Sequence, residues 1–239
     1  MPANLHSDKT SSVFAPGHAL AEDAPRKVHD WLTSLPITAS NKLCPRFDSH
    51  QPQVKQNGKT KREQEFLLGR KCAESQLHAL GEFSNIEVNE DRSPAWPQGF
   101  VGSISHSDKW VWASVARVTD LRSIGIDTEI VTDAETENEL RTEIATEEEW
   151  KIAAATGLNA RQQFSVVFSA KESFYKCWYP TNPRFFGFAD ATITEASSQH
   201  LKIQTARSNP NFGTGPTELN VFFLVNKSDV FTITWMEHE

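Results

Sequence analysis

Apolar residues recur at helical spacing along four stretches of the chain, and each stretch is followed by a residue that stops a helix. The helices that this pattern predicts cover residues 24–35, 60–80, 133–155 and 159–178. In the second of them, the apolar face is expected to consist of Phe66, Leu67, Ala73, Leu77 and Leu80. The predicted helices end at Pro36, Gly81, Gly157 and Pro180, because proline cannot continue a helix and glycine favours its end.

Alternating apolar positions and short runs of β-branched and aromatic residues predict strands in the rest of the chain. The predicted strands cover residues 101–106, 110–118, 124–130, 187–194, 201–205, 219–225 and 230–235. Residues 107–109 are expected to form a turn between the first two strands. The polar segments 44–58, 89–99 and 209–215 contain turn-forming residues and are expected to be loops.

The order of these elements predicts an α+β fold made of two halves. A flexible tail over residues 1–20 precedes an N-terminal half, residues 21–120, and a C-terminal half, residues 121–239. The halves have a similar plan and meet near Asp120. No linker rich in glycine, serine or proline separates them, so two independent domains are not indicated.

The composition excludes several classes of protein. The net charge of −7 over 239 residues argues against a general nucleic-acid binder. No apolar run approaches the ~18 residues that a membrane span requires, and the first residues lack the apolar core of a signal peptide. The three cysteines show neither zinc-site spacing nor a disulfide framework, which fits a reducing cytoplasm. A cytoplasmic protein is therefore expected.

Charge is concentrated in two regions of opposite sign. Residues 55–71 contain six basic residues against two glutamates, whereas residues 127–149 contain ten acidic residues against Arg141 alone. Such runs are most often solvated surfaces. The functional alternative is an anion-binding face in the first region and a metal-binding edge in the second.

Three carboxylates and two lysines could converge where the strand at 124–130 meets the last helix. Asp127 and Glu129 are two apart and therefore share one face of a strand. Glu172 and Lys176 are four apart and share one face of a helix, with Lys171 nearby. Carboxylate oxygens suit Mg²⁺, with Mn²⁺ as the alternative, and lysines beside them indicate a phosphorylated substrate. Taken alone, the helical pair would be a surface contact worth ~0.2–0.5 kcal/mol.

Five short motifs, in order along the chain, carry a resemblance to a known family. They are Gly69-Arg70-Lys71-Cys72-Ala73, Arg92-Ser93-Pro94-Ala95-Trp96-Pro97, Gly102-Ser103-Ile104-Ser105-His106-Ser107, Gly125-Ile126-Asp127-Thr128-Glu129, and Phe168-Ser169-Ala170-Lys171-Glu172-Ser173 followed by Lys176. Each is weak alone. Together they resemble the 4′-phosphopantetheinyl transferases, specifically the larger monomeric type that activates siderophore, peptide and polyketide synthetases.

The resemblance implies a reaction and an architecture. The family transfers the phosphopantetheine arm of coenzyme A to a serine hydroxyl of an acyl or peptidyl carrier protein and releases adenosine 3′,5′-bisphosphate. Its fold is a pseudo-dimer of two α+β halves, with coenzyme A in the cleft between them. Coenzyme A and a carrier protein are thus the implied partners. The resemblance does not decide which pathway the natural carrier belongs to: a siderophore or peptide synthetase, a polyketide or polyunsaturated fatty-acid synthase, or primary fatty-acid synthesis.

The resemblance also implies roles for individual residues. The metal ligands would be Asp127, Glu129 and Glu172. Glu172 would also be the base for the serine, directly or through water, and Lys176 would contact a phosphate with help from Lys171. The other residues implied to bind coenzyme A are Ser105 and His106 at its phosphates and Arg62, Arg70 and Arg92 at its 3′-phosphate. The basic residues of 55–70 are an alternative docking surface for an acidic carrier.

Two other functions compete with the transferase. A catalytically silent module could bind coenzyme A or scaffold a synthetase complex, but it would not need Asp127, Glu129, Glu172 and Lys176 together. A Mg²⁺-dependent phosphohydrolase would need a placed water and would gain nothing from the serine–histidine motif at 102–107 or the proline-rich motif at 92–97.

Overall fold

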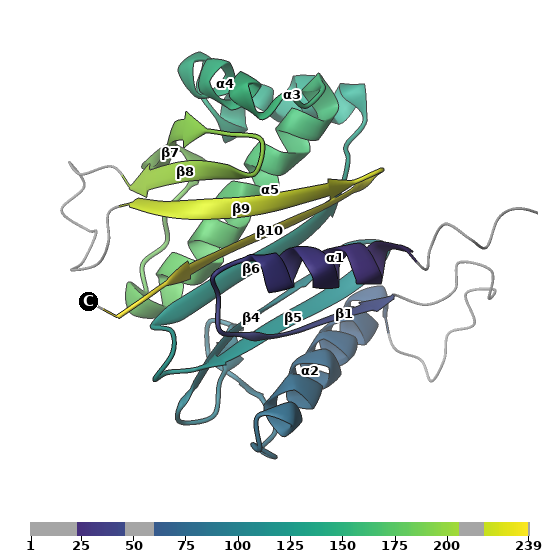
Figure 1. Cartoon of the computed structure of the whole chain (residues 1–239), viewed down its shortest axis with the longest axis vertical. Helices are drawn as coiled ribbons and strands as arrows, with labels where there is room; N and C mark the ends of the chain where they lie inside the picture. The colour runs from purple at the N-terminus through teal and green to yellow at the C-terminus, as the bar shows by residue number, and fades with distance from the viewer. Residues whose placement is uncertain (1–22, 46–59, 206–217, 239) are drawn as a thin grey trace, which may run out of the picture.

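The computed structural model describes residues 23–45, 60–205 and 218–238 (Figure 1). The expected tail over 1–20, the connector over 209–215 and most of the expected loop over 44–58 lie outside these residues. The helices are α1 (Asp23–Ser34), α2 (Lys61–Ala79), α3 (Ala134–Ile144), α4 (Glu147–Ala153) and α5 (Ala160–Trp178), with short 3₁₀ turns at Ala154–Thr156, Tyr179–Thr181 and Phe188–Asp190. Within the described ranges, no helix combines the length and the apolar character that crossing a membrane requires.

The strands form two main antiparallel sheets and one small hairpin. They are β1 (Ser40–Pro45), β2 (Glu87–Val88), β3 (Pro94–Ala95), β4 (Phe100–His106), β5 (Trp110–Arg117), β6 (Ser123–Ile130), β7 (Ala191–Ala196), β8 (His200–Thr205), β9 (Glu218–Asn226) and β10 (Asp229–Met236). The first sheet has the order β1-β5-β4, the second β6-β10-β9-β8-β7, and β2 pairs with β3. The mixed α+β class predicted from the sequence is confirmed.

Serine side chains join the two sheets where the edge strand β4 lies beside the edge strand β6. The Ser103 hydroxyl accepts a hydrogen bond from the backbone N–H of Ile126 at 3.1 Å, and the Ser105 hydroxyl accepts one from Thr128 at 3.3 Å. These hydroxyls take the place of the carbonyls that a neighbouring strand would supply. Two backbone N–H groups at this edge of β6 are therefore satisfied, although β4 and β6 are not paired in one sheet.

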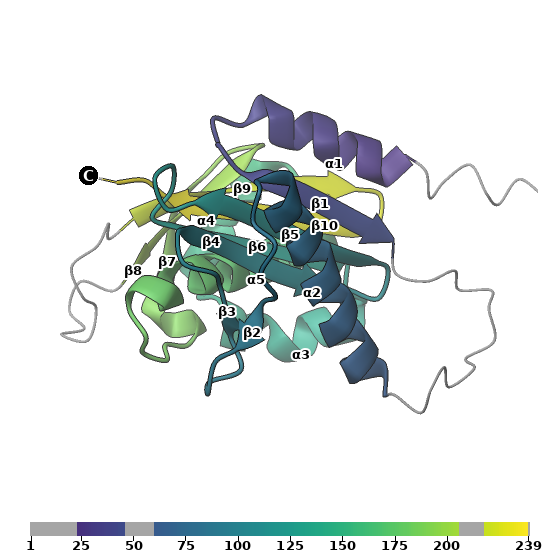
Figure 2. The ribbon, with the colours of Figure 1, turned by 90° about the horizontal axis from the view of Figure 1, so that it is seen from below.

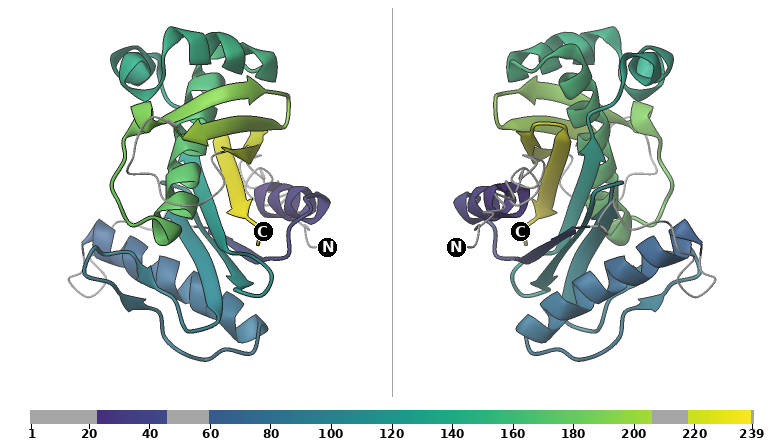
Figure 3. Two further views of the ribbon diagram at one scale, coloured as in Figure 1. Left: turned by 90° about the vertical axis from the view of Figure 1, so that its left-hand side faces the viewer. Right: turned by 90° about the vertical axis from the view of Figure 1, so that its right-hand side faces the viewer.

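The helices lie on opposite faces of this combined strand layer. In Figure 2, α1 lies on one side of the strands, while α2 and α5 lie on the other. Figure 3 shows the same separation for α1, in purple, and α2, in blue. One core cluster joins α1 to strands of both sheets and includes Val28, Trp112, Ile126 and Phe231, so the halves share buried surface.

Residues without bulky side chains let α5 lie directly against β6. The Ser165 hydroxyl accepts the N–H of Thr132 at 2.9 Å, and the Ser123 hydroxyl donates to the Cys177 carbonyl at 2.6 Å. Between these contacts, a Cβ atom on Gly125 would lie 1.9 Å from the Ser173 carbonyl oxygen. Only glycine therefore fits at position 125.

Capping residues explain the boundaries of the two longest helices. Thr60 and Glu63 form a reciprocal capping box at the start of α2, as do Asn159 and Gln162 at the start of α5. Both helices agree closely with their predicted ranges, as do α1 and the strands β4, β5, β6, β8, β9 and β10.

The single helix predicted over 133–155 is wrong. Ala145 has an extended backbone, with φ −154° and ψ 157°, which separates α3 from α4. Thr146 and Glu149 then form a capping box of their own, which begins α4. A threonine followed three residues later by glutamate signals a helix start in the sequence itself.

Four further predictions need correction. Cys44 belongs to strand β1 rather than to a loop, and residues 94–95 of the expected loop 89–99 form β3. β7 begins at Ala191, because a 3₁₀ turn occupies residues 188–190. The expected apolar face of α2 is also wrong in part, since Phe66 and Leu67 are exposed while its buried residues include Arg70, Cys72 and Gln76.

The contact between α5 and β6 predicts a strong effect of Gly125→Ala. The added methyl group collides with backbone atoms that cannot move aside, so we expect destabilisation by about 3 kcal/mol or more, or failure to fold. Gly187→Ala is the matched control, because no atom lies within 4 Å of its Cβ position, and it should stay within about 0.5 kcal/mol. Urea denaturation measures both changes. Equal stability of the two variants would contradict the close approach of α5 and β6.

Candidate functional site

The Asp127 carboxylate lies buried where β4, β6 and α5 meet. Its Oδ1 atom accepts hydrogen bonds from the Ser105 hydroxyl at 2.8 Å and from the Lys176 ammonium at 2.6 Å. Its Oδ2 atom accepts one from the Ser169 hydroxyl at 2.8 Å. Lys176 also donates to Ser105 at 3.1 Å. Residues from both halves of the chain thus hold one carboxylate in a fixed orientation.

Two more carboxylates crowd this point. Burial and the negative charge of Asp127 raise the pKa of Glu129 to about 8, Lys176 opposes that rise, and Glu172 adds to it. Burial also raises the pKa of Glu172, against the opposing charge of Lys176. The structure therefore brings Asp127, Glu129, Glu172 and Lys176 together, as the strand and helix spacings predicted. The negative charge of the group exceeds what one lysine can balance.

The donors of this group are hard oxygen atoms of the kind that Mg²⁺ prefers. Within the described residues, no three Asp, Glu, His or Cys side chains are already arranged as a metal site. Lys176 itself occupies an oxygen of Asp127. The donor chemistry and the raised pKa of Glu129 and Glu172 nevertheless fit a divalent cation, because a cation would relieve their repulsion.

Of the three carboxylates, Glu129 lines a pocket of about 300 Å³. Residues of α2, of the end of β4 and the turn after it, and of β6 share its wall: Glu65, His106, Ser107, Asp108, Glu129 and Ile130. His106 is partly exposed there, with its Nδ1 atom 3.9 Å from a Glu65 carboxylate oxygen. Ser105, by contrast, is buried and bonded to Asp127, so it orients that carboxylate rather than lining the pocket.

Arg70 lies on α2 and is 7% exposed as a residue, with the Cζ atom of its guanidinium 4.9 Å from the centre of the Phe66 ring. Burial lowers its pKa, while Glu74 and Glu87 oppose that shift. The Nη1 atom is buried and makes no hydrogen bond to any described residue. A buried guanidinium nitrogen without an acceptor is energetically unfavourable, and an anion would satisfy it.

The two other arginines singled out in the sequence are exposed. Arg62 lies one turn before Phe66 on α2, at a pocket of about 420 Å³ that Glu63, Phe66 and Leu67 also line. Arg92 lies in the turn between β2 and β3 with φ 70°, a left-handed conformation. The adjacent Asp91 accepts a hydrogen bond from the Tyr179 hydroxyl at 2.6 Å, which attaches this turn to the end of α5.

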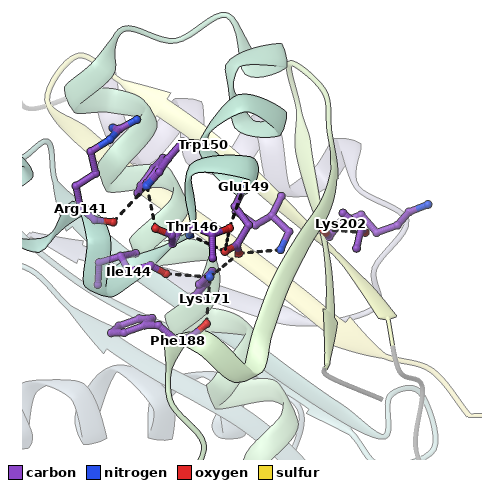
Figure 4. Close-up of polar contacts among 11 residues, drawn as sticks. Arg141, Ile144, Thr146, Glu149, Trp150, Lys171, Phe188 and Lys202 are labelled. Atoms are coloured by element: carbon purple, nitrogen blue, oxygen red, sulfur yellow. Dashed lines mark hydrogen bonds and ion pairs between the residues drawn. The ribbon is translucent and has the colours of Figure 1, made fainter. Parts of the chain in front are cut away.

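Lys171 lies outside this group, which corrects the expectation that it contacts a phosphate. Its ammonium forms a salt bridge with Glu149 at 2.7 Å and donates to the carbonyls of Ile144 at 2.9 Å and Phe188 at 3.1 Å (Figure 4). An ammonium has three donors, and three partners engage them. With its side chain 1% exposed, Lys171 connects α5 to α3, α4 and the turn before β7.

Sequence reasoning missed the residues that position Asp127. Besides Ser105, the Ser169 hydroxyl donates a hydrogen bond to the carboxylate. The Ser169 hydroxyl also lies 2.9 Å from the Thr232 hydroxyl, and Thr232 donates to the Ser169 carbonyl at 3.0 Å. A signal was present, because Ser165, Ser169 and Ser173 recur every four residues and therefore face β6 together. Thr232 gave no local signal, since β10 brings it to this point from the end of the chain.

Comparison with known proteins identifies relatives. A model of the 4′-phosphopantetheinyl transferase N-terminal domain matches residues 49–116, and a model of the 4′-phosphopantetheinyl transferase superfamily matches residues 123–224. The 4′-phosphopantetheinyl transferase Npt of Nocardia iowensis is 34% identical over 162 residues, covering 67% of this chain and 69% of that protein. Enterobactin synthase component D is 31% identical over 154 residues in Salmonella typhi (64% and 63%) and 36% over 163 in Escherichia coli O157:H7 (68% and 75%).

The buried ion pair predicts that Lys171→Met acts on stability. Removing the ammonium leaves the Glu149 carboxylate buried without its cation, so we expect a loss of about 3–5 kcal/mol in the free energy of unfolding. Lys151→Met is the control, because that exposed lysine pairs with exposed Glu148 at 3.4 Å and should lose no more than about 1 kcal/mol. Urea denaturation at neutral pH compares them. A mild effect of Lys171→Met would show that its ammonium is not committed to Glu149.

Proposed function

Because the chain belongs to the 4′-phosphopantetheinyl transferase superfamily, we propose that it transfers the 4′-phosphopantetheine arm of coenzyme A to a serine hydroxyl of an apo carrier protein, releasing adenosine 3′,5′-bisphosphate. One observation carries this proposal. The carboxylates Asp127, Glu129 and Glu172 gather around Lys176 beside a pocket that both halves line. That arrangement fits chemistry on a phosphoanhydride.

The two halves are proposed to form a pseudo-dimer with a boundary near Asp120. One family model ends at residue 116 and the other begins at 123, which supports that boundary. Each half packs one long helix, α2 or α5, against an antiparallel sheet. Since one chain supplies both halves, a second copy is not needed to build the site, and we propose a monomer.

Mg²⁺ is the proposed metal, with Asp127, Glu129 and Glu172 as its protein ligands. Bound there, it would neutralise charge on the diphosphate of coenzyme A. Hydrogen bonds from Ser105 and Ser169 fix the Asp127 carboxylate at the junction of β4, β6 and α5, where the metal would bind. Because Lys176 bonds to Asp127 in the structure, we propose that its ammonium turns toward a phosphate when the substrate binds.

Glu172 is the proposed base for the carrier serine. Its burial raises its pKa above that of an ordinary glutamate, which brings its proton affinity closer to what a base needs at neutral pH. The serine oxygen attacks the phosphorus that bears the pantetheine arm, the proton passes to Glu172 directly or through water, and the bond to the departing nucleotide phosphate breaks. Lys176 then faces the negative charge that develops on the leaving group.

The N-terminal half is proposed to hold the nucleotide end of coenzyme A. Arg70 supplies the strongest argument, because its buried Nη1 atom has no acceptor within the described residues and the 3′-phosphate would provide one. His106, at the pocket beside Glu129, is proposed to contact the diphosphate. Contacts from Arg62 and Arg92 to the 3′-phosphate stay predictions.

A docking role for the basic residues of 55–70 also stays a prediction. Residues 55–59 lie outside the described part of the chain. The Lys61 ammonium already contacts Asp108 at 2.9 Å, and Arg70 is buried. Among the described residues of this region, Arg62 is the remaining exposed cation.

The decisive test weighs a carrier protein before and after reaction. The full chain, coenzyme A, Mg²⁺ and an apo carrier should give a carrier serine heavier by one phosphopantetheine. Asp127→Asn should slow transfer at least about a hundredfold, because it removes a charge from the junction. Asp133→Asn is the control, because asparagine caps α3 as well as aspartate does and should leave the rate unchanged.

The outcomes separate the alternatives. Coenzyme A binding without modification of any of several carriers would favour a silent module. Cleavage of the diphosphate without carrier modification would favour a hydrolase. A normal rate for folded Asp127→Asn would overturn the site assignment.

The orphaned nitrogen of Arg70 predicts a selective effect of Arg70→Met, which keeps the apolar packing against Phe66. The KM for coenzyme A should rise about tenfold to a hundredfold, because a charge-assisted contact to the 3′-phosphate is lost. The KM for dephospho-coenzyme A, which lacks that phosphate, should not change. Lys71→Met is the control, since its side chain is exposed on the same helix. Equal increases for both substrates would remove Arg70 from the 3′-phosphate site.

A further inference from the structure

Strand β1, at the edge of the first sheet, is attached to α2 by side chains in register. Ser40, Lys42 and Cys44 alternate along β1 and therefore project from one face of the strand. Each meets a residue of α2: Ser40 donates to Gln76 at 2.7 Å, Lys42 donates to Ser75 at 3.0 Å, and the Sγ atom of Cys44 lies 3.2 Å from that of Cys72. The two thiols are thus held together by the packing of two regular elements.

The two thiols have unequal environments. Cys72 is 2% exposed, and its Sγ atom lies 3.3 Å from the Lys42 carbonyl oxygen, whereas Cys44 is only partly buried. A hydrogen bond from Cys72 lowers the pKa of Cys44 to about 7, burial opposes that shift, and the charge of Lys42 supports it. The same contact and burial raise the pKa of Cys72. Cys44 is therefore the thiol that ionises and meets solvent.

We propose that Cys44 and Cys72 are an oxidisable pair that closes an intramolecular disulfide between β1 and α2 when the protein meets a peroxide. The Cys44 thiolate attacks one peroxide oxygen, the O–O bond breaks, and Cys44 becomes a sulfenic acid while hydroxide leaves and takes up a proton. Cys72 gives up its proton and attacks the Cys44 sulfur, and the sulfenic oxygen leaves as water. Two thiols and one hydrogen peroxide thus yield one disulfide and two waters.

The geometry favours this pair over any other in the described residues. A disulfide bond is about 2.05 Å long, so the sulfur atoms need to approach by only about 1.2 Å. Cys177, the remaining cysteine, is completely buried between α5 and β6 and contacts Gly125 there. It can neither reach the pair nor meet an oxidant without unfolding.

The experiment treats the reduced full chain with hydrogen peroxide under native conditions and then alkylates it in denaturant. The expected product has lost two hydrogen atoms by intact mass, retains one alkylatable thiol at Cys177, and yields a cross-linked peptide that joins Cys44 to Cys72. Dithiothreitol should restore three thiols. The oxidised chain should also melt about 5 °C higher, because the cross-link restricts the unfolded chain.

Three variants test which cysteine attacks the peroxide and which cysteine then attacks the sulfenic acid. Cys44→Ser should abolish the disulfide. Cys72→Ser should stop the reaction at a Cys44 sulfenic acid, which dimedone traps. Cys177→Ala is the control and should oxidise like the wild type. If Cys72→Ser does not fold, alkylation of the native wild type decides the order, since Cys44 should react at least about tenfold faster than Cys72.

Four results would overturn the proposal. They are three free thiols after a treatment that oxidises a reference dithiol, a disulfide that involves Cys177, a disulfide that forms only between two chains, and a melting temperature that does not rise on cross-linking.

Discussion

The placement of β6 is the constraint on which the rest of the structure depends. One edge of this strand pairs with β10, the other meets β4, and α5 crosses one face. At the β4 side, serine hydroxyls accept the N–H groups of Ile126 and Thr128. At the α5 side, Gly125 leaves room for the helix backbone. Small residues are required on both sides, because larger ones would separate the elements whose side chains surround Asp127.

The close packing of β4, β6 and α5 also determines the electrostatics at their junction. Three carboxylates lie where burial makes negative charge unfavourable, and the raised pKa of Glu129 shows how poorly the protein alone balances them. Lys176 offsets part of that charge. The serines hold Asp127 from two directions, so relief of repulsion by moving that side chain away is prevented. Strain of this electrostatic kind is expected at a site that takes up a cation with its substrate.

Local patterns in the sequence predicted the elements well and their partners less well. The helix spacing of Glu172 and Lys176 correctly placed both side chains with Asp127. Lys171 is five residues before Lys176 and lies about 140° from it around the helix axis. The helical periodicity alone therefore places the two lysines on different faces. The periodicity could not predict that Glu149 pairs with Lys171, because only the packing of α4 on α5 brings the two side chains together. Strand β1 was missed for the same reason. Its polar sequence gives no strand pattern, and the segment is held in place by pairing with β5 and by side-chain contacts with α2.

An unsatisfied hydrogen-bond donor in one half and crowded carboxylates in the other connect the fold with the proposed substrate. In the first half, the buried guanidinium of Arg70 has a nitrogen with no acceptor among the described residues. In the second half, burial raises the pKa values of Glu129 and Glu172, and the negative charge of Asp127 raises them further. An inorganic phosphate would satisfy the arginine but repel the carboxylates, and a divalent cation alone would do the reverse. A ligand with a terminal phosphate at one end and a metal-bound diphosphate at the other satisfies both, and coenzyme A with Mg²⁺ has that form.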